Sequence, residues 1–225
     1  MTRPRTALAV GVAVGAAVVA VVVYAAMWVG YRQGWDWLHR VDYSMLNGAH
    51  DIATKHPMWV WFWNVVSIAL GPVPLRLLGA VAAVAALVRH HVRAALVLLA
   101  CAQLSGLVTA AAKGLANRPR PSTMLVPASG TSFPSGHALE ATAALLALLS
   151  YLLPMMSRRM RRVAIAVTAL CLVLVGAARV ALNVHYLSDV LAGWSLGYLY
   201  FLLCILIFRP PSRPAADAAP MITAQ

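Results

Sequence analysis

The chain has 225 residues, of which 62% are hydrophobic and only 11% are charged. Water-soluble domains carry about 25% charged residues, so this composition excludes an ordinary soluble enzyme and predicts an integral membrane protein. The net charge of +12 does not indicate nucleic-acid binding, because the basic residues form short clusters between apolar runs, where the positive-inside rule places them.

The first apolar run covers residues 7–29 and follows the basic sequence MTRPR. It is too long for a signal peptide, so we expect a first spanning helix that stays in the protein. Residues 31–70 are more mixed and predict an extracytoplasmic loop with interfacial helix; acidic and aromatic side chains up to Pro57 suggest that its first part is hydrated. The tryptophans at positions 59, 61 and 63 are typical of an aromatic belt at the headgroup level rather than of a recognition cage.

A break at residues 71–74 (GPVP) separates this segment from five further apolar runs, each expected to be a spanning helix. They cover residues 75–88, 94–113, 137–153, 163–179 and 187–208. Residues 209–225 are rich in Pro and Ala and predict a disordered cytoplasmic tail. Cys101, Cys171 and Cys204 lie within apolar runs and are interpreted as buried small hydrophobic residues. The sequence thus predicts an all-α protein, with residues 1–225 forming one six-helix membrane bundle.

The basic residues also predict the orientation of the bundle. One set falls at the same side of the six spans: Arg3, Arg5, Arg89, Arg93, Arg158, Arg159, Arg161, Arg162, Arg209 and Arg213. The positive-inside rule places this side, with both termini, in the cytoplasm. Three polar strings at the other ends of the spans would then share the extracytoplasmic side.

The first polar string is KGLANRPRP, residues 113–121, in which Lys113 and Arg120 are seven residues apart. Pro119 and Pro121 stiffen the loop and lower the cost of holding two cations together. Taken alone, the string has a simpler interpretation, in which Lys113 extends to the interface and Arg118 and Arg120 are solvated loop charges.

The second string is PSGH, residues 134–137, at the start of the fourth span. Ser135 and Gly136 can offer backbone N–H groups, and Ser135 a hydroxyl, at a helix N-terminus that favours anions. Gly136 also permits close approach of a ligand to the backbone. The alternative is a simple helix cap followed by an interfacial histidine, His137.

The third string, RVALNVHYLSD, places Arg179 at the end of the fifth span and His185 and Asp189 on one face of the sixth. A carboxylate that binds one imidazole nitrogen fixes the tautomer and leaves the other nitrogen free to attack. An unrelated histidine beside a capping aspartate is the alternative. Together the strings supply the cations, nucleophile and proton donor that phosphoryl transfer requires.

These strings match the patterns K-x6-R-P, P-S-G-H and S-R-x5-H-x3-D, and the chain therefore resembles the membrane lipid phosphatases of the type 2 phosphatidic acid phosphatase (PAP2) superfamily. The resemblance implies a PAP2/haloperoxidase-like helical core. It implies that His185 attacks phosphorus to form a phosphohistidine, that His137 protonates the leaving alcohol and then activates water, and that Asp189 orients His185. Substrate phosphate would contact Lys113, Arg120, Ser135, Gly136 and Arg179.

Two positions need separate comment. Ala178 stands where the family pattern has Ser, so a hydroxyl near the phosphate is missing. Glu140 lies one turn after His137 in an apolar helix; it is expected either to contact His137 and raise the pKa of that histidine, or to face water. No cluster of Asp and Glu suggests a metal site, and we expect no cofactor.

The expected substrate is a lipid phosphate, since a site at the ends of spanning helices can admit a headgroup while the tail stays in the bilayer. Phosphatidic acid, phosphatidylglycerol phosphate and polyprenyl diphosphate all fit this description. The alternatives are a non-catalytic phospholipid-binding or transporter-like protein with a relic phosphate site and, less suited to so apolar a chain, a vanadate-dependent haloperoxidase.

Overall fold

The structure is a computed structural model that describes residues 3–208, with side chains from residue 11 onward. The predicted tail at 209–225 lies outside the described residues. All regular elements in the described part of the chain are helical, as the sequence predicted. They are α1 (Arg3–Gln33), α2 (Asp36–Lys55), α3 (Pro57–Ala69), α4 (Pro72–Val88), α5 (Val92–Leu99), a π-helical turn (Ala100–Leu104), α6 (Ser105–Ala116), α7 (Gly136–Leu152), a 3₁₀ turn (Leu153–Met155), α8 (Arg158–Ala181) and α9 (Leu187–Ile207).

Six segments of the described chain are long and apolar enough to cross a membrane, which confirms the predicted number of spans. They are Gly11–Gln33, Pro57–Val88, Val92–Ala116, Gly136–Met155, Arg158–Ala181 and Leu187–Ile207. The break predicted at residues 71–74 is present, because α3 ends at Ala69 and α4 begins at Pro72. The expected second span, 75–88, is nevertheless only the last part of a 32-residue apolar segment that includes the tryptophan-rich α3.

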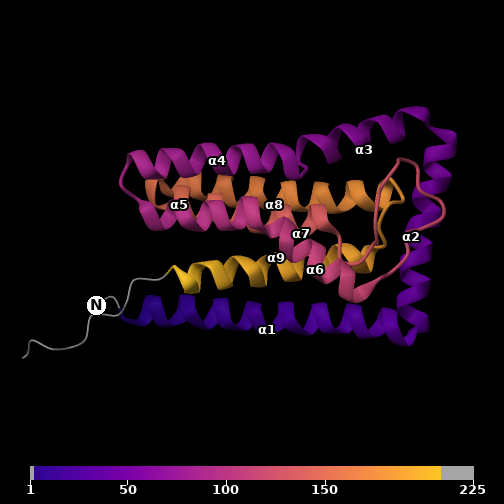
Figure 1. The fold of residues 1–225 in the computed structure, drawn as a ribbon, viewed down its shortest axis with the longest axis horizontal. Coiled ribbons are helices and arrows are strands. Elements are labelled where there is room, and N and C mark those ends of the chain that lie inside the picture. The colour runs from indigo at the N-terminus through magenta and orange to yellow at the C-terminus, as the bar shows by residue number, and fades with distance from the viewer. Residues whose placement is uncertain (1–2, 209–225) are drawn as a thin grey trace, which may run out of the picture.

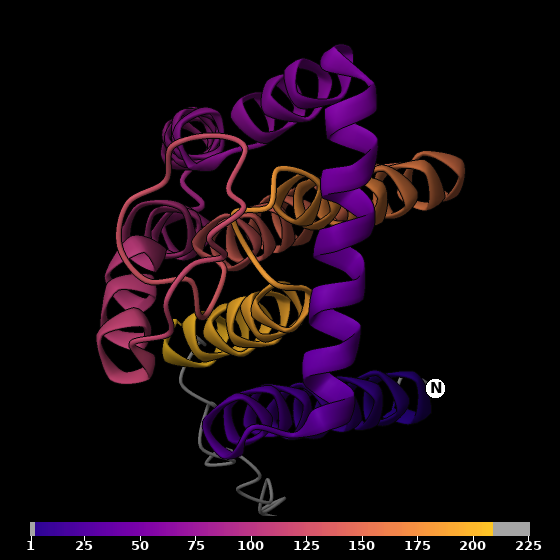
Figure 2. The ribbon, with the colours of Figure 1, turned by 90° about the vertical axis from the view of Figure 1, so that its right-hand side faces the viewer.

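The helices that contain these segments run roughly along one direction, whereas α2 lies across one end of the bundle (Figures 1 and 2). Most of the region before Pro57, where the sequence predicted a hydrated segment with interfacial helix, forms the 20-residue helix α2. Its buried residues are Leu38, Asp42, Leu46, Ala49 and Ala53, spaced three or four apart. That spacing places them on one face of a helix, and the face packs on the bundle.

Helix α7 packs most extensively against α9 and also contacts α8 and α4. Two glycines of α9 make the close approach possible. A Cβ atom at Gly193 would lie 2.6 Å from the carbonyl oxygen of Ser135, and one at Gly197 would lie 2.5 Å from that of Leu139. Small residues four apart let two helix backbones come together in a membrane protein. This contact brings the start of α9 beside the start of α7.

The α2 end of the bundle gathers the ends of several helices. Helices α6 and α8 end there, α7 and α9 begin there, and residues 117–135 form an irregular loop over them (Figure 2). The basic turns after α4 and before α8 lie at the opposite end (Figure 1). All three polar strings of the sequence therefore meet at one end of the bundle.

Candidate active site

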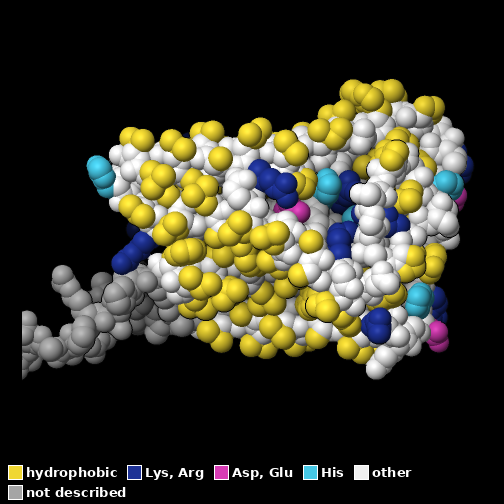
Figure 3. Space-filling model, viewed as in Figure 1, with side chains coloured by type: hydrophobic (Ala, Val, Ile, Leu, Met, Phe, Trp, Pro, Cys, Tyr) yellow, Lys and Arg dark blue, Asp and Glu magenta, His cyan; other side chains and the backbone are white. Residues whose placement is uncertain are grey.

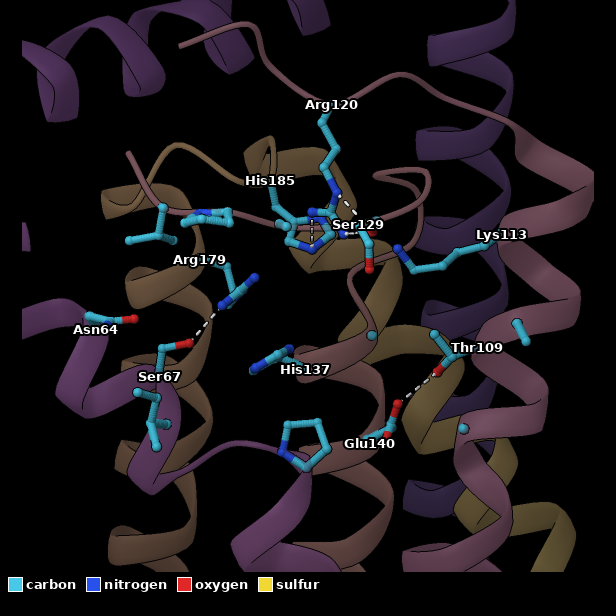
Figure 4. A pocket seen from close by; sticks show the side chains of 18 residues that line it. Asn64, Ser67, Thr109, Lys113, Arg120, Ser129, His137, Glu140, Arg179 and His185 are labelled. Carbon is cyan, nitrogen blue, oxygen red and sulfur yellow. Dashed lines mark hydrogen bonds between the residues drawn. The ribbon is translucent and has the colours of Figure 1, made fainter. Parts of the chain in front are cut away.

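The polar strings surround a cavity of about 680 Å³. Six of the eight predicted site residues line it: Lys113, Arg120, Gly136, His137, Arg179 and His185. His185 and Arg120 lie on one side of the space and His137 on the other, while Lys113 and Arg179 extend from two flanks (Figure 4). The other two residues, Ser135 and Asp189, are fully buried behind this lining.

Helix α6 ends where Asn117 adopts a left-handed conformation, with φ of 49°. Asn tolerates this region better than most residues, and the turn directs the chain into the Pro-rich loop. Lys113, in the last turn of α6, donates a hydrogen bond to the carbonyl oxygen of Thr131. The loop is thereby tied to the helix that it leaves.

The guanidinium of Arg120 is held by backbone carbonyl groups. Its Nη2 donates to Ser129 at 2.8 Å, its Nε to Gly130 at 3.0 Å and its Nη1 to Val184 at 2.7 Å. Nη1 also lies 3.2 Å from Nε2 of His185. Burial lowers the pKa of Arg120 from its ordinary value, yet an arginine stays protonated at neutral pH. A fixed cation therefore lies against the imidazole.

The contacts of His185 determine its tautomer. An arginine N–H can only donate, so Nε2 of His185 must accept from Arg120 and carries no proton. Nδ1 therefore carries the proton and faces Oδ2 of Asp189 at 3.3 Å. The pKa of His185 lies well below its ordinary value because the ring is buried and the cations Arg179, Arg120 and Lys113 are close. His185 is thus a neutral imidazole whose Nε2 lone pair accepts from Arg120 at the edge of the cavity.

The PSGH string contributes differently from the prediction. The backbone N–H of Ser135 donates to the carbonyl oxygen of Asp189 at 2.9 Å, so this group is not free for a ligand in the structure. The Ser135 hydroxyl is buried and has no hydrogen-bond partner among the described residues. At Gly136, a Cβ would lie 2.9 Å from Thr109 Cγ2. The glycine lets α6 and α7 approach and carries His137 into the cavity.

Arg179 enters the cavity from the end of α8 and is 7% exposed. Its Nη1 donates to the hydroxyl of Ser67 at 2.6 Å, and its Nε is buried without a partner in the described chain. Ser67, on α3, lines the same cavity. Ala178 is fully buried and is not part of the lining. A hydroxyl therefore lies beside Arg179, although it comes from α3 and not from position 178.

Glu140 has a partner that the sequence analysis did not consider. Its Oε2 accepts from Nη2 of Arg76 at 2.6 Å, and its Oε1 lies 3.5 Å from the Thr109 hydroxyl. The side chain of Glu140 is 10% exposed. The proposed contact with His137 is replaced by an ion pair between α4 and α7.

The structure also shows a buried ion cluster that sequence reasoning missed. It contains Asp42 of α2, Arg118 of the loop, and Ser188 and Asp189 of α9. Arg118 is 3% exposed and donates to both carboxylates, at 2.8 Å to Asp42 and 2.7 Å to Asp189. Burial opposes the charge of Arg118, but the carboxylates raise its pKa above the ordinary value. Arg118 is therefore not the solvated loop charge of the simpler interpretation.

Part of this cluster carried a signal in the sequence. Asp42 occupies the apolar stripe of α2, between Leu38 and Leu46. An acidic residue at a core position of an amphipathic helix requires a buried partner. The identity of that partner was not readable, because Arg118 is 76 positions away. Within residues 3–208, no group of three or more His, Cys, Asp or Glu could hold a metal ion.

The cavity opens on the side of the bundle. Its lining includes Ile68, Pro72 and Ala110, from α3, α4 and α6. On the face shown in Figure 3, basic, acidic and histidine side chains are visible through a hollow in an otherwise largely hydrophobic surface between α4 and α6. A molecule in the surrounding apolar phase would reach the polar groups through this side.

Comparisons with known proteins agree with one another. The family model described as the PAP2 superfamily matches residues 94–213. Phosphatidylglycerophosphatase B of Bacillus subtilis (strain 168) is 43% identical over 82 residues, which cover 35% of this chain and only 40% of the relative. A crystal structure of a transmembrane PAP2 type phosphatidylglycerolphosphate phosphatase from Bacillus subtilis superposes with a TM-score of 0.70 and 25% identity, covering 87% of this chain and 94% of that one.

Proposed function

The chain belongs to the PAP2 superfamily, and from this premise we propose that it is a membrane phosphatase that removes phosphate from a lipid phosphate. The observation that carries the proposal is the cavity in which three cations and two histidines face one space. Phosphatidylglycerol phosphate is the first substrate to test, since the relatives named above act on it. Phosphatidic acid and polyprenyl diphosphate are the next two.

The proposed reaction has two steps. Nε2 of His185 attacks phosphorus, the P–O ester bond breaks, and the ester oxygen takes a proton from His137. A water molecule then gives a proton to His137 while its oxygen attacks phosphorus, the P–N bond breaks, and inorganic phosphate leaves. Asp189 orients His185 in both steps. The approaching phosphate, being negative, favours the protonated His137 that the first step needs.

Lys113, Arg120 and Arg179 would bind the non-bridging phosphate oxygens and stabilise the charge of the transition state. Arg120 would exchange its contact with Nε2 for a phosphate oxygen, which frees the lone pair. Monoester hydrolysis requires accelerations of up to ~10²¹-fold, whereas one donor supplies only ~10² to 10³, so several groups must act together. The hydroxyl of Ser135 and the backbone of Gly136 are further contacts in this proposal.

A lipid substrate is supported by the side opening of the cavity between α4 and α6. The headgroup would enter the cavity while the hydrocarbon tail stays among the apolar surfaces of the helices. The proposed orientation, with both termini in the cytoplasm, is supported by the basic residues at the end of the bundle away from α2. The site would then lie at the extracytoplasmic face, with residues 31–70 covering it as an outward segment of one membrane domain.

The test is release of inorganic phosphate from the three lipids by purified protein in detergent micelles. The expected result is turnover by the wild type and loss of turnover in His185→Ala. Both proteins must show the same thermal unfolding, so that the loss reports on chemistry. Equal rates in the two proteins would refute the mechanism, and binding of all three lipids without phosphate release would identify a non-catalytic protein instead.

A further inference from the structure

The buried ion cluster of Asp42, Arg118, Ser188 and Asp189 lies directly behind the proposed nucleophile. Arg118 contacts Asp189 through Nη1 and Asp42 through Nη2, and Nη1 also lies 2.7 Å from the Ser188 hydroxyl. The guanidinium also lies over the ring of Tyr186, 3.8 Å from its centroid. The cation is thus held by α2, by α9 and by the residue that precedes α9, and it also lies 4.8 Å from the ring centroid of Tyr31 in α1.

Asp42 is bound at the start of α9. Its Oδ1 accepts the backbone N–H of Ser188 at 2.9 Å, and its Oδ2 accepts the Ser188 hydroxyl at 2.6 Å. The first N–H groups of a helix have no partner within the helix, and a carboxylate there is favoured. Asp42 therefore fixes the position from which Asp189 extends. It also lies outside residues 94–213, which the family model matches.

The two oxygens of Asp189 have separate partners. Oδ1 accepts from Arg118 at 2.7 Å, whereas Oδ2 accepts the backbone N–H of Tyr186 at 3.0 Å and faces Nδ1 of His185 at 3.3 Å. The carboxylate is thus shared between a cation and the imidazole. If Arg118 had no other counterion, its whole charge would act on Asp189 and weaken the attraction of that carboxylate for the imidazole.

We propose that Asp42 and Arg118 form a positioning pair for His185. Arg118 holds Asp189 with Oδ2 toward the imidazole, and Asp42 balances the charge of Arg118, so that Asp189 acts on His185 as a full anion. Positive charge develops on the imidazole as Nε2 forms its bond to phosphorus, and an anionic Asp189 stabilises it. Helix α2 thereby contributes to the reaction without contacting the substrate.

This inference rests on the proposed function, in which His185 is the nucleophile. The test compares wild type, Asp42→Asn and the double variant Asp42→Asn/Arg118→Gln, using phosphatidylglycerol phosphate in mixed micelles. Rates are expressed per folded protein, at a temperature well below each unfolding midpoint. Asp51→Asn is the matched control, because Asp51 is an exposed aspartate on the same helix.

Asp42→Asn should lower kcat by ~10- to 100-fold, the loss seen when the partners that orient metal-binding histidines are removed. KM should stay within about twofold, because the phosphate-binding cations are unchanged. The double variant should recover several-fold of the lost kcat, since it removes the cation that Asp42 no longer balances while Gln can still donate to Asp189. Asp42→Glu, which keeps the charge, should exceed Asp42→Asn, and Asp51→Asn should match wild type.

A purely structural role predicts a different pattern, in which the double variant is no better than Asp42→Asn. That result, or a wild-type kcat in Asp42→Asn, would overturn the proposal. If Asp42→Asn does not fold, Arg118→Lys is the variant that tests the proposal. A single ammonium group cannot replace the contacts of the guanidinium with both Asp42 and Asp189. Arg118→Lys should lose ~10-fold or more in kcat at unchanged KM, and a wild-type kcat would reject the pair. An inactive wild type would instead reject the proposed function.

Discussion

Replacing Gly193 by alanine tests whether the close contact of α9 with α7 sets the geometry of the cavity. The added Cβ would lie 2.6 Å from the carbonyl oxygen of Ser135 and 2.9 Å from the Cβ of Ala138. Ordinary contacts begin at 3.4 Å, so the two helices must separate locally by ~1 Å. The first clash is with backbone, which cannot move aside as a flexible side chain can.

The separation acts on the site directly, because Ser135 precedes Gly136 and His137, which line the cavity. A displacement of ~1 Å in a catalytic group can cost ~10²-fold in rate, and overpacking costs ~1–3 kcal/mol of stability. We therefore expect Gly193→Ala to lower kcat by ~10²-fold and to lower the unfolding temperature.

The assay is phosphate release from phosphatidylglycerol phosphate, paired with thermal unfolding in the same detergent. Gly15→Ala is the control: Gly15 is also in a spanning helix, and a Cβ there meets nothing within 4 Å. Since alanine favours a helix by ~1 kcal/mol over glycine, the control should be as stable as wild type or more so. Wild-type kcat and stability in Gly193→Ala would show that the two helices do not need this close contact.

Two further predictions concern the charges of the cavity. Burial and Arg179 lower the pKa of His185 most, and Arg120 lowers it further, so Arg120→Gln should raise that pKa. The acid limb of the pH-rate profile should therefore move to higher pH than in wild type. A shift of the acid limb to lower pH would contradict the assignment. Glu140→Gln breaks the ion pair with Arg76, whose side chain is 40% exposed. The free energy of unfolding should therefore fall by ~1–2 kcal/mol, less than the ~3–5 kcal/mol lost when a fully buried pair is broken. The pH-rate profile of Glu140→Gln should match wild type, and a shifted profile with unchanged stability would restore the idea that Glu140 acts on His137.

The sequence was sufficient to predict the number of spanning helices and several of the residues that line the cavity, for different reasons. Apolar runs of spanning length force helices, because a backbone in lipid must satisfy its own hydrogen bonds. The three polar strings lie at the ends of those helices, so the number of spans already places them on one side. Lys113, Arg120, His137, Arg179 and His185 do share one cavity.

The partners of the charged residues were not predictable in the same way. Arg76 pairs with Glu140 across 64 positions, and Arg118 reaches Asp42 across 76. Such pairs are set by how the helices pack, and no local spacing encodes them. Asp42 is a partial exception, because its place between the apolar residues Leu38 and Leu46 was a signal of burial that the prediction of a hydrated segment did not use. Ser135 shows the reverse case, since its motif suggested a ligand contact and its N–H binds the Asp189 carbonyl.

The same pairs explain why the cavity keeps a net positive charge. Among the described residues that line it, Glu140 is the one carboxylate, and Arg76 neutralises it. Asp189 is held behind His185 by Arg118 and does not face the space. Lys113, Arg120 and Arg179 therefore present their charge to the cavity without an ion pair to either carboxylate among the described residues. Buried like charges repel one another, and a phosphate dianion relieves that repulsion. These ion pairs thus leave the cavity with a net positive charge, as the proposed binding of phosphate requires.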